Sequence, residues 1–129
     1  MNAVSLLGRI LFPAAFFTAG LFGHLLGTKG TVAYARAAGA PLPDVLVPLA
    51  GVVIVAASIM MWLGIKPRLA ALAMFLFLLP TTFIMHRFWG LSDPMTAMMQ
   101  QTQFMKNTSL MGAALLIMTI EKWPLAVKP

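Results

Sequence analysis

Cysteine is absent from this chain of 129 residues, and charged side chains make up only 9% of it. Without a thiol, the chain can form no disulfide, no thiolate nucleophile and no cysteine-ligated metal, haem or iron–sulfur site of its own. Soluble domains carry a charge on about 25% of their residues, so this chain has too few ionic groups to cover a water-facing surface. A water-soluble monomer is therefore excluded, and the expected solvent is a lipid bilayer.

Acidic residues are the scarcest charged type, with three Asp and Glu against nine Lys and Arg, which gives a formal net charge of +6. A positive balance of this kind can indicate nucleic-acid binding when the basic residues cluster. Here they are spread along the chain without a dense run or interleaved aromatic residues. We therefore expect no nucleic-acid partner.

Hydrophobic residues make up 60% of the chain, and the mean hydropathy is +0.91. Long stretches with few or no charges are typical of helices that cross the hydrocarbon core, which takes about 20 residues. The sequence predicts an all-α, polytopic membrane protein, a four-transmembrane-helix bundle forming a single domain over 1–129. We expect its helices at about 5–27, 43–65, 68–88 and 94–121.

The connections carry their own local signals. Lys66, Pro67 and Arg68 separate two apolar runs, and so short a turn makes the flanking helices antiparallel neighbours. Asp93 followed by Pro94 is typical of a helix N-cap with proline at the first helical position. Between the first two spans, residues 31–38 predict a short interfacial helix that ends at a glycine, residue 39.

Small residues are expected to make the helix contacts, because close backbone approach stabilises helix pairs in lipid. The first span carries Ala15, Ala19, Gly23 and Gly27 at a spacing of four, which predicts its packing face. A partner surface is expected on the last helix at residues 109, 112 and 113. One proline lies in each of the first three helices, at residues 13, 48 and 80, and each invites a kink.

Polar residues are expected to gather at one end of the bundle, where two histidines close the first and third helices. In lipid each such side chain needs a partner or a wet cavity. One interpretation is an ordinary interfacial belt, in which Lys and Arg reach the headgroups and Trp marks their level. The other is a pocket for an anionic or quinone-like headgroup, with these ligand-binding residues: His24, His86, Arg87, Trp89, Gln103, Lys106 and Asn107.

The sequence supports a catalytic site or a metal site less well than a ligand-binding pocket. No Ser/His/Asp constellation, glycine-rich phosphate loop or paired intramembrane carboxylate is present, so we name no catalytic residue. The two histidines lack the spacing of a helical ligand pair, so no metal site is predicted. A copper(I) site remains an alternative, because thioethers are soft ligands and four methionines follow His86, at residues 95, 98, 99 and 105.

The order of several segments resembles the DoxX family of small bacterial four-helix membrane proteins. The resemblance covers nearly the whole chain and is carried by LLGRILFPAAFFTAGLFG, GTVAYARAAGAPLP, PLAG, LGIKPRLAALAMFLFLLPTTFIMHRFW and QFMKNTSLMGAALL. It implies a multi-pass protein of the bacterial inner membrane, from a family linked in some members to thiosulfate:quinone oxidoreduction or to membrane redox complexes. Six residues match the family pattern: Arg9, Arg68, His86, Trp89, Lys106 and Asn107.

Two positions depart from the family pattern. Members often carry Lys near the end of the first helix, where this chain has His24, and an acidic residue after PLAG, where it has Ile54. A Lys–Glu pair is therefore missing, and a neutral imidazole tolerates the loss of a carboxylate partner. These departures leave any catalytic role inherited from the family in doubt.

Two functions follow as hypotheses. The first is an accessory or quinone/lipid-binding subunit of a membrane redox system, which holds such a molecule or anchors a redox protein partner. The second is a catalytic membrane subunit of a quinone-linked oxidoreductase of the thiosulfate:quinone type, in which the histidines move protons. No covalent cofactor is expected, a quinone is the candidate ligand, and an oligomer is compatible with the sequence. A weak bias of basic residues predicts that both termini are cytoplasmic.

Overall fold

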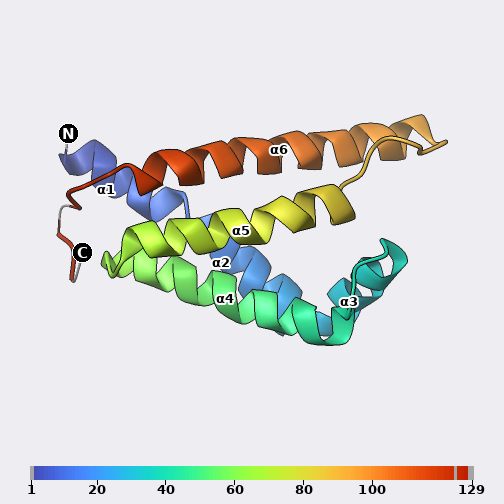
Figure 1. Cartoon of the computed structure of the whole chain (residues 1–129), viewed down its shortest axis with the longest axis horizontal. Coiled ribbons are helices and arrows are strands. Elements are labelled where there is room, and N and C mark those ends of the chain that lie inside the picture. The colour runs from blue at the N-terminus through green and yellow to red at the C-terminus, as the bar shows by residue number, and fades with distance from the viewer. Residues whose placement is uncertain (1, 124, 128–129) are drawn as a thin grey trace.

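The computed structural model describes residues 2–123 and 125–127, and over these residues every regular element is a helix. Long helical rods lie side by side and form a bundle, with a short helix at one end (Figure 1). The first rod consists of three consecutive pieces, α1 (Asn2–Leu11), α2 (Ala14–Thr18) and η1 (Ala19–Leu25). The others are α4 (Pro43–Leu63), α5 (Pro67–Met85) and α6 (Pro94–Met118), and the short helix is α3 (Thr28–Ala37).

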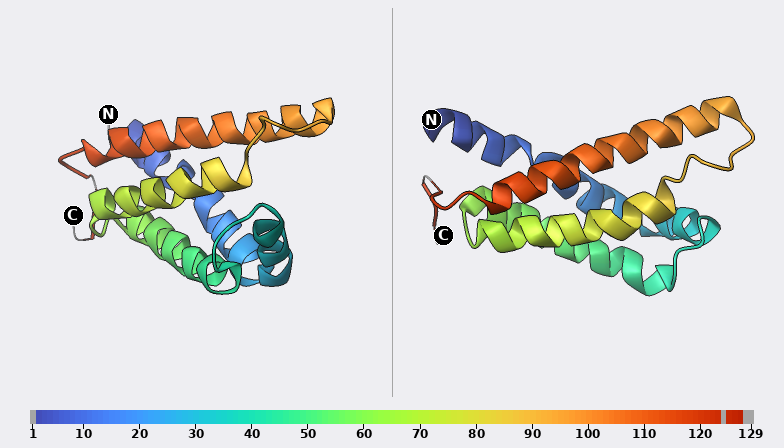
Figure 2. Two further views of the ribbon diagram at one scale, coloured as in Figure 1. Left: turned by 45° about the vertical axis from the view of Figure 1, so that its right-hand side comes forward. Right: turned by 45° about the horizontal axis from the view of Figure 1, so that its top comes forward.

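Three of the rods are long and apolar enough to cross a membrane: Ala3–Leu25, Pro43–Leu63 and Pro67–Met85. The helix α6 has 25 residues, but polar side chains occupy much of its first half. It runs alongside α5 in each view (Figures 1 and 2). The predicted helical bundle is therefore confirmed, with a fourth helix less apolar than the other three.

The first rod is interrupted twice. Proline at position 13 carries no N–H and separates α1 from α2. Further on, the chain widens into the π-helix η1, where the N–H of Leu26 donates to the carbonyl of Leu21 at 2.8 Å, five residues back. By contrast, the prolines at positions 48 and 80 lie inside the continuous helices α4 and α5. Only the first of the three expected proline effects divides a helix.

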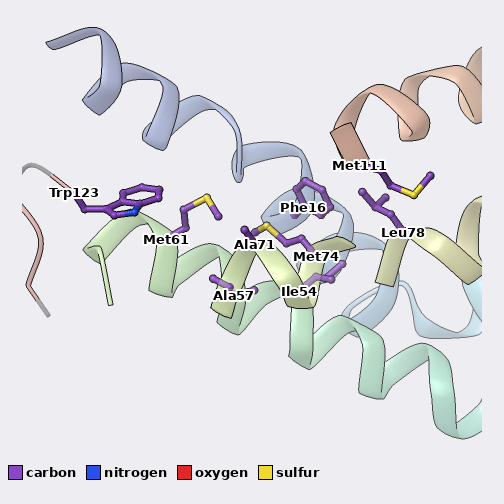
Figure 3. Close-up of a cluster of buried hydrophobic side chains, with 10 residues drawn as sticks. Phe16, Ile54, Ala57, Met61, Ala71, Met74, Leu78, Met111 and Trp123 are labelled. Carbon is purple, nitrogen blue, oxygen red and sulfur yellow. The ribbon is translucent and has the colours of Figure 1, made fainter. Parts of the chain in front are cut away.

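The main core lies where the first rod, α4, α5 and α6 meet (Figure 3). Ile54, Met61 and Met74 have no exposed surface, and Phe16 is 4% exposed. The position at which the family often carries an acid is thus a fully buried isoleucine. An apolar side chain here avoids the cost of placing a charge in the bundle interior.

The predicted packing stripe of the first rod is wrong. Ala15 and Ala19 are exposed, whereas Gly20 is buried and faces α4, where an added Cβ would lie 2.8 Å from side-chain atoms of Ile54 and Val55. The buried positions of this rod, residues 9, 13, 16 and 20, keep ordinary helical spacing across the break at residue 13, so small side chains at a spacing of four did not identify the face that meets the bundle. The close backbone approach predicted for this rod exists, but at a different glycine.

The expected partner surface on α6 is also wrong. Ser109 and Gly112 are exposed, and the Ser109 hydroxyl donates to the carbonyl of Met105 in its own helix. The buried residues of α6 are Asn107, Met111 and Ala114, on the helix that packs along α5. The buried face of α6 therefore combines one small residue, Ala114, with two larger ones, and it differs from the face that was expected.

The predicted connections are confirmed. After Gly64, at φ +73°, and Lys66, at φ +43°, the chain reverses and places α4 and α5 side by side. The Asp93 carboxylate accepts a hydrogen bond from the Thr96 N–H at 3.1 Å, as expected of an N-cap. The short helix predicted between the first two spans is present as α3, which begins three residues earlier than predicted and ends before Gly39, at φ +86°.

The start of α1 and the segment after α6 lie at the same end of the bundle (Figure 1). We call this the sealed end, and it contains Arg9, Gly64, Arg68 and Trp123. The Arg9 guanidinium lies 5.9 Å from the Trp123 ring centre and 3.5 Å from the carbonyl of Leu125. Arg68 donates to the carbonyl of Met118 at 2.7 Å. These contacts fold the segment after α6 back over the α4–α5 turn.

Candidate functional site

At the end opposite the sealed end, a groove of about 580 Å³ runs between α3, α4 and α5. We call it the groove. Its walls are apolar, and it is lined on α4 by Leu46, Leu49 and Val53 and on α5 by Leu76 and Ile84, among others. Both walls belong to spans that fit a membrane, and Leu49 and Leu76 are more than half exposed. Exposed leucines on two candidate spans favour an opening towards the hydrocarbon of a membrane.

His24 lines the groove from the first rod. Its Nδ1 lies 3.0 Å from the carbonyl of Val47 on α4, and its ring meets the edge of Phe77 on α5 at 5.5 Å between centres. Gly51 permits this approach, since a Cβ at that position would lie 2.5 Å from the Cβ of His24. The imidazole is held by neighbours on two helices.

His86 lines the same groove from the end of α5. Its Nδ1 lies 3.0 Å from Oε1 of Gln100 on α6. The Nε2 of Gln100 donates to the Tyr34 hydroxyl on α3 at 2.6 Å, and that hydroxyl donates to the carbonyl of Met85 at 2.9 Å. A chain of three hydrogen bonds thus joins α3, α5 and α6 and ends at the imidazole.

Arg87 and Trp89 lie beside the groove rather than in it. They line a second hollow of about 480 Å³, shared with Tyr34 and Gln100. Arg87 donates to the carbonyl of Ala38 at 2.8 Å, which ties the segment after α5 to the end of α3. Trp89 packs against Phe88 and Phe104 with ring centres 5.3 and 5.9 Å apart. Both residues hold the loop between α5 and α6 in place.

The three predicted residues on α6 do not line the groove. Lys106 is exposed and donates to Gln103 Oε1 at 2.7 Å, one turn earlier on the same helix. Asn107 is 6% exposed, on the face that packs along α5. The four methionines proposed as copper ligands are all more than half exposed on α6, at residues 95, 98, 99 and 105. Within the described part of the chain, no three His, Cys, Asp or Glu residues are grouped as for a metal ion.

The sequence analysis missed the contribution of Tyr34 to this end of the bundle. A signal was present, because residue 34 is the one tyrosine of the chain and lies in a helix expected at the interface. A tyrosine there can pack its ring and still donate from its hydroxyl. The carbonyl of Val47 could not have been found from the sequence, since any residue carries one.

Comparisons with known proteins agree with this architecture. Residues 4–87, which cover most of the first rod and all of α3, α4 and α5, match the DoxX family. The chain is 33% identical over 112 residues to the inner membrane protein YphA of Escherichia coli (strain K12), covering 87% of this chain and 79% of that protein. No solved structure matches the chain. The chain is therefore a multi-pass inner membrane protein that belongs to the DoxX family.

Proposed function

We propose that the protein is an accessory subunit of a membrane redox system and that it holds a quinone-type or lipid-like molecule in the groove. The observation that carries the proposal is an apolar groove, open to the hydrocarbon, with two imidazoles at one end. The link to a redox system rests on the resemblance to the DoxX family.

The dimensions and surface of the groove support such a ligand. Its volume of about 580 Å³ falls in the range of small-molecule sites, roughly 300 to 1,000 Å³. Such sites combine apolar walls with a few polar groups that orient the ligand. A ligand with an apolar tail can enter from the bilayer and leave its polar head beside His24 and His86.

The first test fills the groove without changing its polar groups. Ala50 lines it from α4, whereas Ala56 is exposed on the same helix outside it. Wild type, Ala50→Phe and Ala56→Phe are purified in lipid nanodiscs, and mass spectrometry measures the apolar small molecules retained per protein. We expect Ala50→Phe to lose the retained molecule and Ala56→Phe to keep it. Equal retention by both variants, or none by wild type, contradicts the proposal.

The polar end is tested in the same assay with His24→Ala and His86→Gln. Each removes an imidazole from the groove, and we expect retention to fall by up to about tenfold, the value of one hydrogen bond. Lys106→Gln is the matched control, since Lys106 is exposed on α6 away from the groove. A loss as large in the control variant would show that the effect is not local to the groove.

We also propose that the sealed end faces the cytoplasm. Lys66 and Arg68 lie in the short turn at that end, and cytoplasmic loops carry an excess of basic residues. Because the chain has no cysteine, single cysteines at residues 3 and 127 can be labelled selectively in intact cells. We expect a reagent that cannot cross the inner membrane to label neither, and labelling of either from outside contradicts this orientation.

A further inference from the structure

We infer that the groove selects a ligand whose head donates a hydrogen bond, such as an alcohol or a phenol. This inference rests on the proposed function and deepens it. For a quinone-type molecule, it means that the reduced hydroquinone binds more tightly than the oxidised dicarbonyl form. The argument depends on which ring nitrogen of each histidine carries the proton.

The tautomer of His24 follows from its partner. Its Nδ1 lies 3.0 Å from the carbonyl of Val47, and a carbonyl oxygen can only accept. Nδ1 must therefore carry a hydrogen and donate it. In the neutral ring the lone pair then lies on Nε2, which can only accept.

The tautomer of His86 follows from the chain of hydrogen bonds behind it. The carbonyl of Met85 can only accept, so the Tyr34 hydroxyl donates to it and has a lone pair left for Gln100. The Gln100 group facing Tyr34 is therefore its NH₂, which turns Oε1 towards the imidazole. Because Oε1 can only accept, Nδ1 of His86 donates, and its Nε2 also becomes an acceptor.

The remaining polar groups of the groove add to the number of hydrogen-bond acceptors. Among the described residues, neither Nε2 has a hydrogen-bond partner, and both histidines line the groove. Thr31 also lines it, but its hydroxyl donates to the carbonyl of Gly23 at 2.6 Å, so only acceptor capacity is left. Thr81 is the remaining lining side chain with a hydroxyl, and it can donate or accept. The groove thus offers more acceptors than donors.

An excess of acceptors discriminates between ligand heads. A hydroxyl pairs with an Nε2, whereas a carbonyl or an ether presents another acceptor and leaves both nitrogens without a partner. An unpaired polar group shielded from water costs more than a formed hydrogen bond contributes. The groove should therefore reject an acceptor head more strongly than it binds a donor head.

The first experiment measures the tautomers directly and needs no ligand. The chain has two histidines, so ¹⁵N-histidine labelling gives spectra of only these rings, assigned with His24→Ala and His86→Gln. At about pH 8, where imidazole is normally neutral, we expect a protonated Nδ1 and an unprotonated Nε2 on both rings. A proton on Nε2 of either ring overturns the inference.

The second experiment compares two probes with the same apolar body, 4-nonylphenol and its O-methyl ether. Neither probe undergoes quinone redox chemistry. They differ at the oxygen, where the ether carries a methyl group in place of the donor hydrogen of the phenol. Equilibrium binding to the protein in nanodiscs is corrected with empty nanodiscs of the same lipid. We expect the phenol to bind wild type about five- to tenfold more tightly than the ether, the effect of roughly one hydrogen bond.

Gln100→Leu removes the acceptor that fixes His86, so the preference for the phenol should fall by about half or more. Gln101→Leu is the matched control, because Gln101 is exposed on the same helix and the hydrogen bond to His86 comes from its neighbour Gln100. An ether that binds as tightly as the phenol overturns the inference and leaves the proposed function standing. If neither probe binds, both the inference and the proposed function are wrong.

Discussion

The two ends of the bundle contain the same kind of hydrogen bond but differ in what it leaves exposed. At both, a side chain with N–H groups donates to a main-chain carbonyl: Arg68 to Met118 at the sealed end and His24 to Val47 at the groove. At the sealed end, the segment after α6 then covers the turn, with Trp123 only 9% exposed. At the groove, each imidazole keeps a second nitrogen without a partner among the described residues. The same kind of hydrogen bond thus closes the bundle at one end and leaves a ring nitrogen without a described partner at the other.

Packing also differs between the ends. The main core extends from Phe16 to Trp123 and includes the sealed end, whereas a separate small cluster of Val32, Ala35 and Val47 lies beside the groove. The groove end is held mainly by hydrogen bonds at exposed side chains such as Tyr34 and Arg87. We therefore expect changes at the sealed end to lower stability more than changes at the groove end.

The largest effect is expected for Gly64→Ala at the sealed end. Gly64 has a φ of +73°, and an added Cβ would lie 2.8 Å from the backbone Cα of Ala126. Left-handed strain and overpacking together should lower the free energy of unfolding by about 2 to 4 kcal/mol. The measurement is unfolding in mixed micelles with increasing denaturing detergent.

Gly112→Ala is the matched control for this change. Gly112 lies inside α6 with no atom within 4 Å of an added Cβ, so alanine should leave stability unchanged or raise it by up to about 1 kcal/mol. If both variants lost the same free energy of unfolding, the sealed end would be no more sensitive to an added Cβ than the exposed face of α6.

The smallest effect is expected at the start of α6, near the groove. Hydrogen bonds from the Thr96 hydroxyl and backbone N–H lower the pKa of Asp93 below its usual 3.8. A lowered pKa in the folded state means that the cap stabilises the helix above about pH 4 and is lost as the pH falls through the folded value. Because the carboxylate is exposed, we expect only local fraying.

Hydrogen exchange, corrected for intrinsic rates, measures this fraying at the Thr96 amide. Asp93→Ala should reduce protection a few-fold at neutral pH, and wild type should fall to the same level in acid. Ser92→Ala is the control, since Ser92 is exposed and the capping side chain of α6 is that of Asp93. Protection that is independent of both Asp93 and pH would show that α6 is held here by other contacts.

Much of the fold could be predicted because its signals are local. The length of each apolar run can be read directly from the sequence. The turn and cap signals act within a few residues: the Lys66–Pro67–Arg68 turn, the Asp93 cap and the glycine after α3. The structure contains all of them. The packing faces could not be predicted, since they depend on the phase of each helix. In the first rod the buried face passes through residues 9, 13, 16 and 20, and Gly20 makes the close contact that was expected of Ala19 and Gly23.

The site was predictable in part for the same reason. His24 and His86 end their helices at the same level, so counting residues along two spans was enough to bring them together. The position of Gln103, Lys106 and Asn107 relative to the groove also depends on how α6 is rotated about its axis. The packing of α6 along α5 determines this rotation. The sequence of α6 offers no single apolar stripe that would fix this rotation.

The π-helix in the first rod has an evolutionary consequence. A π turn differs from an α turn by one extra residue, so deleting one residue from Ala19–Leu25 would restore an ordinary helix. Successive residues of an α-helix lie about 100° apart around its axis, so one residue gained in an ordinary helix would turn everything beyond it by about that angle. The π turn absorbs the extra residue locally, so Phe16 and His24 can both face the bundle with or without it. A single codon could therefore be lost or gained in this segment without moving His24 away from the groove.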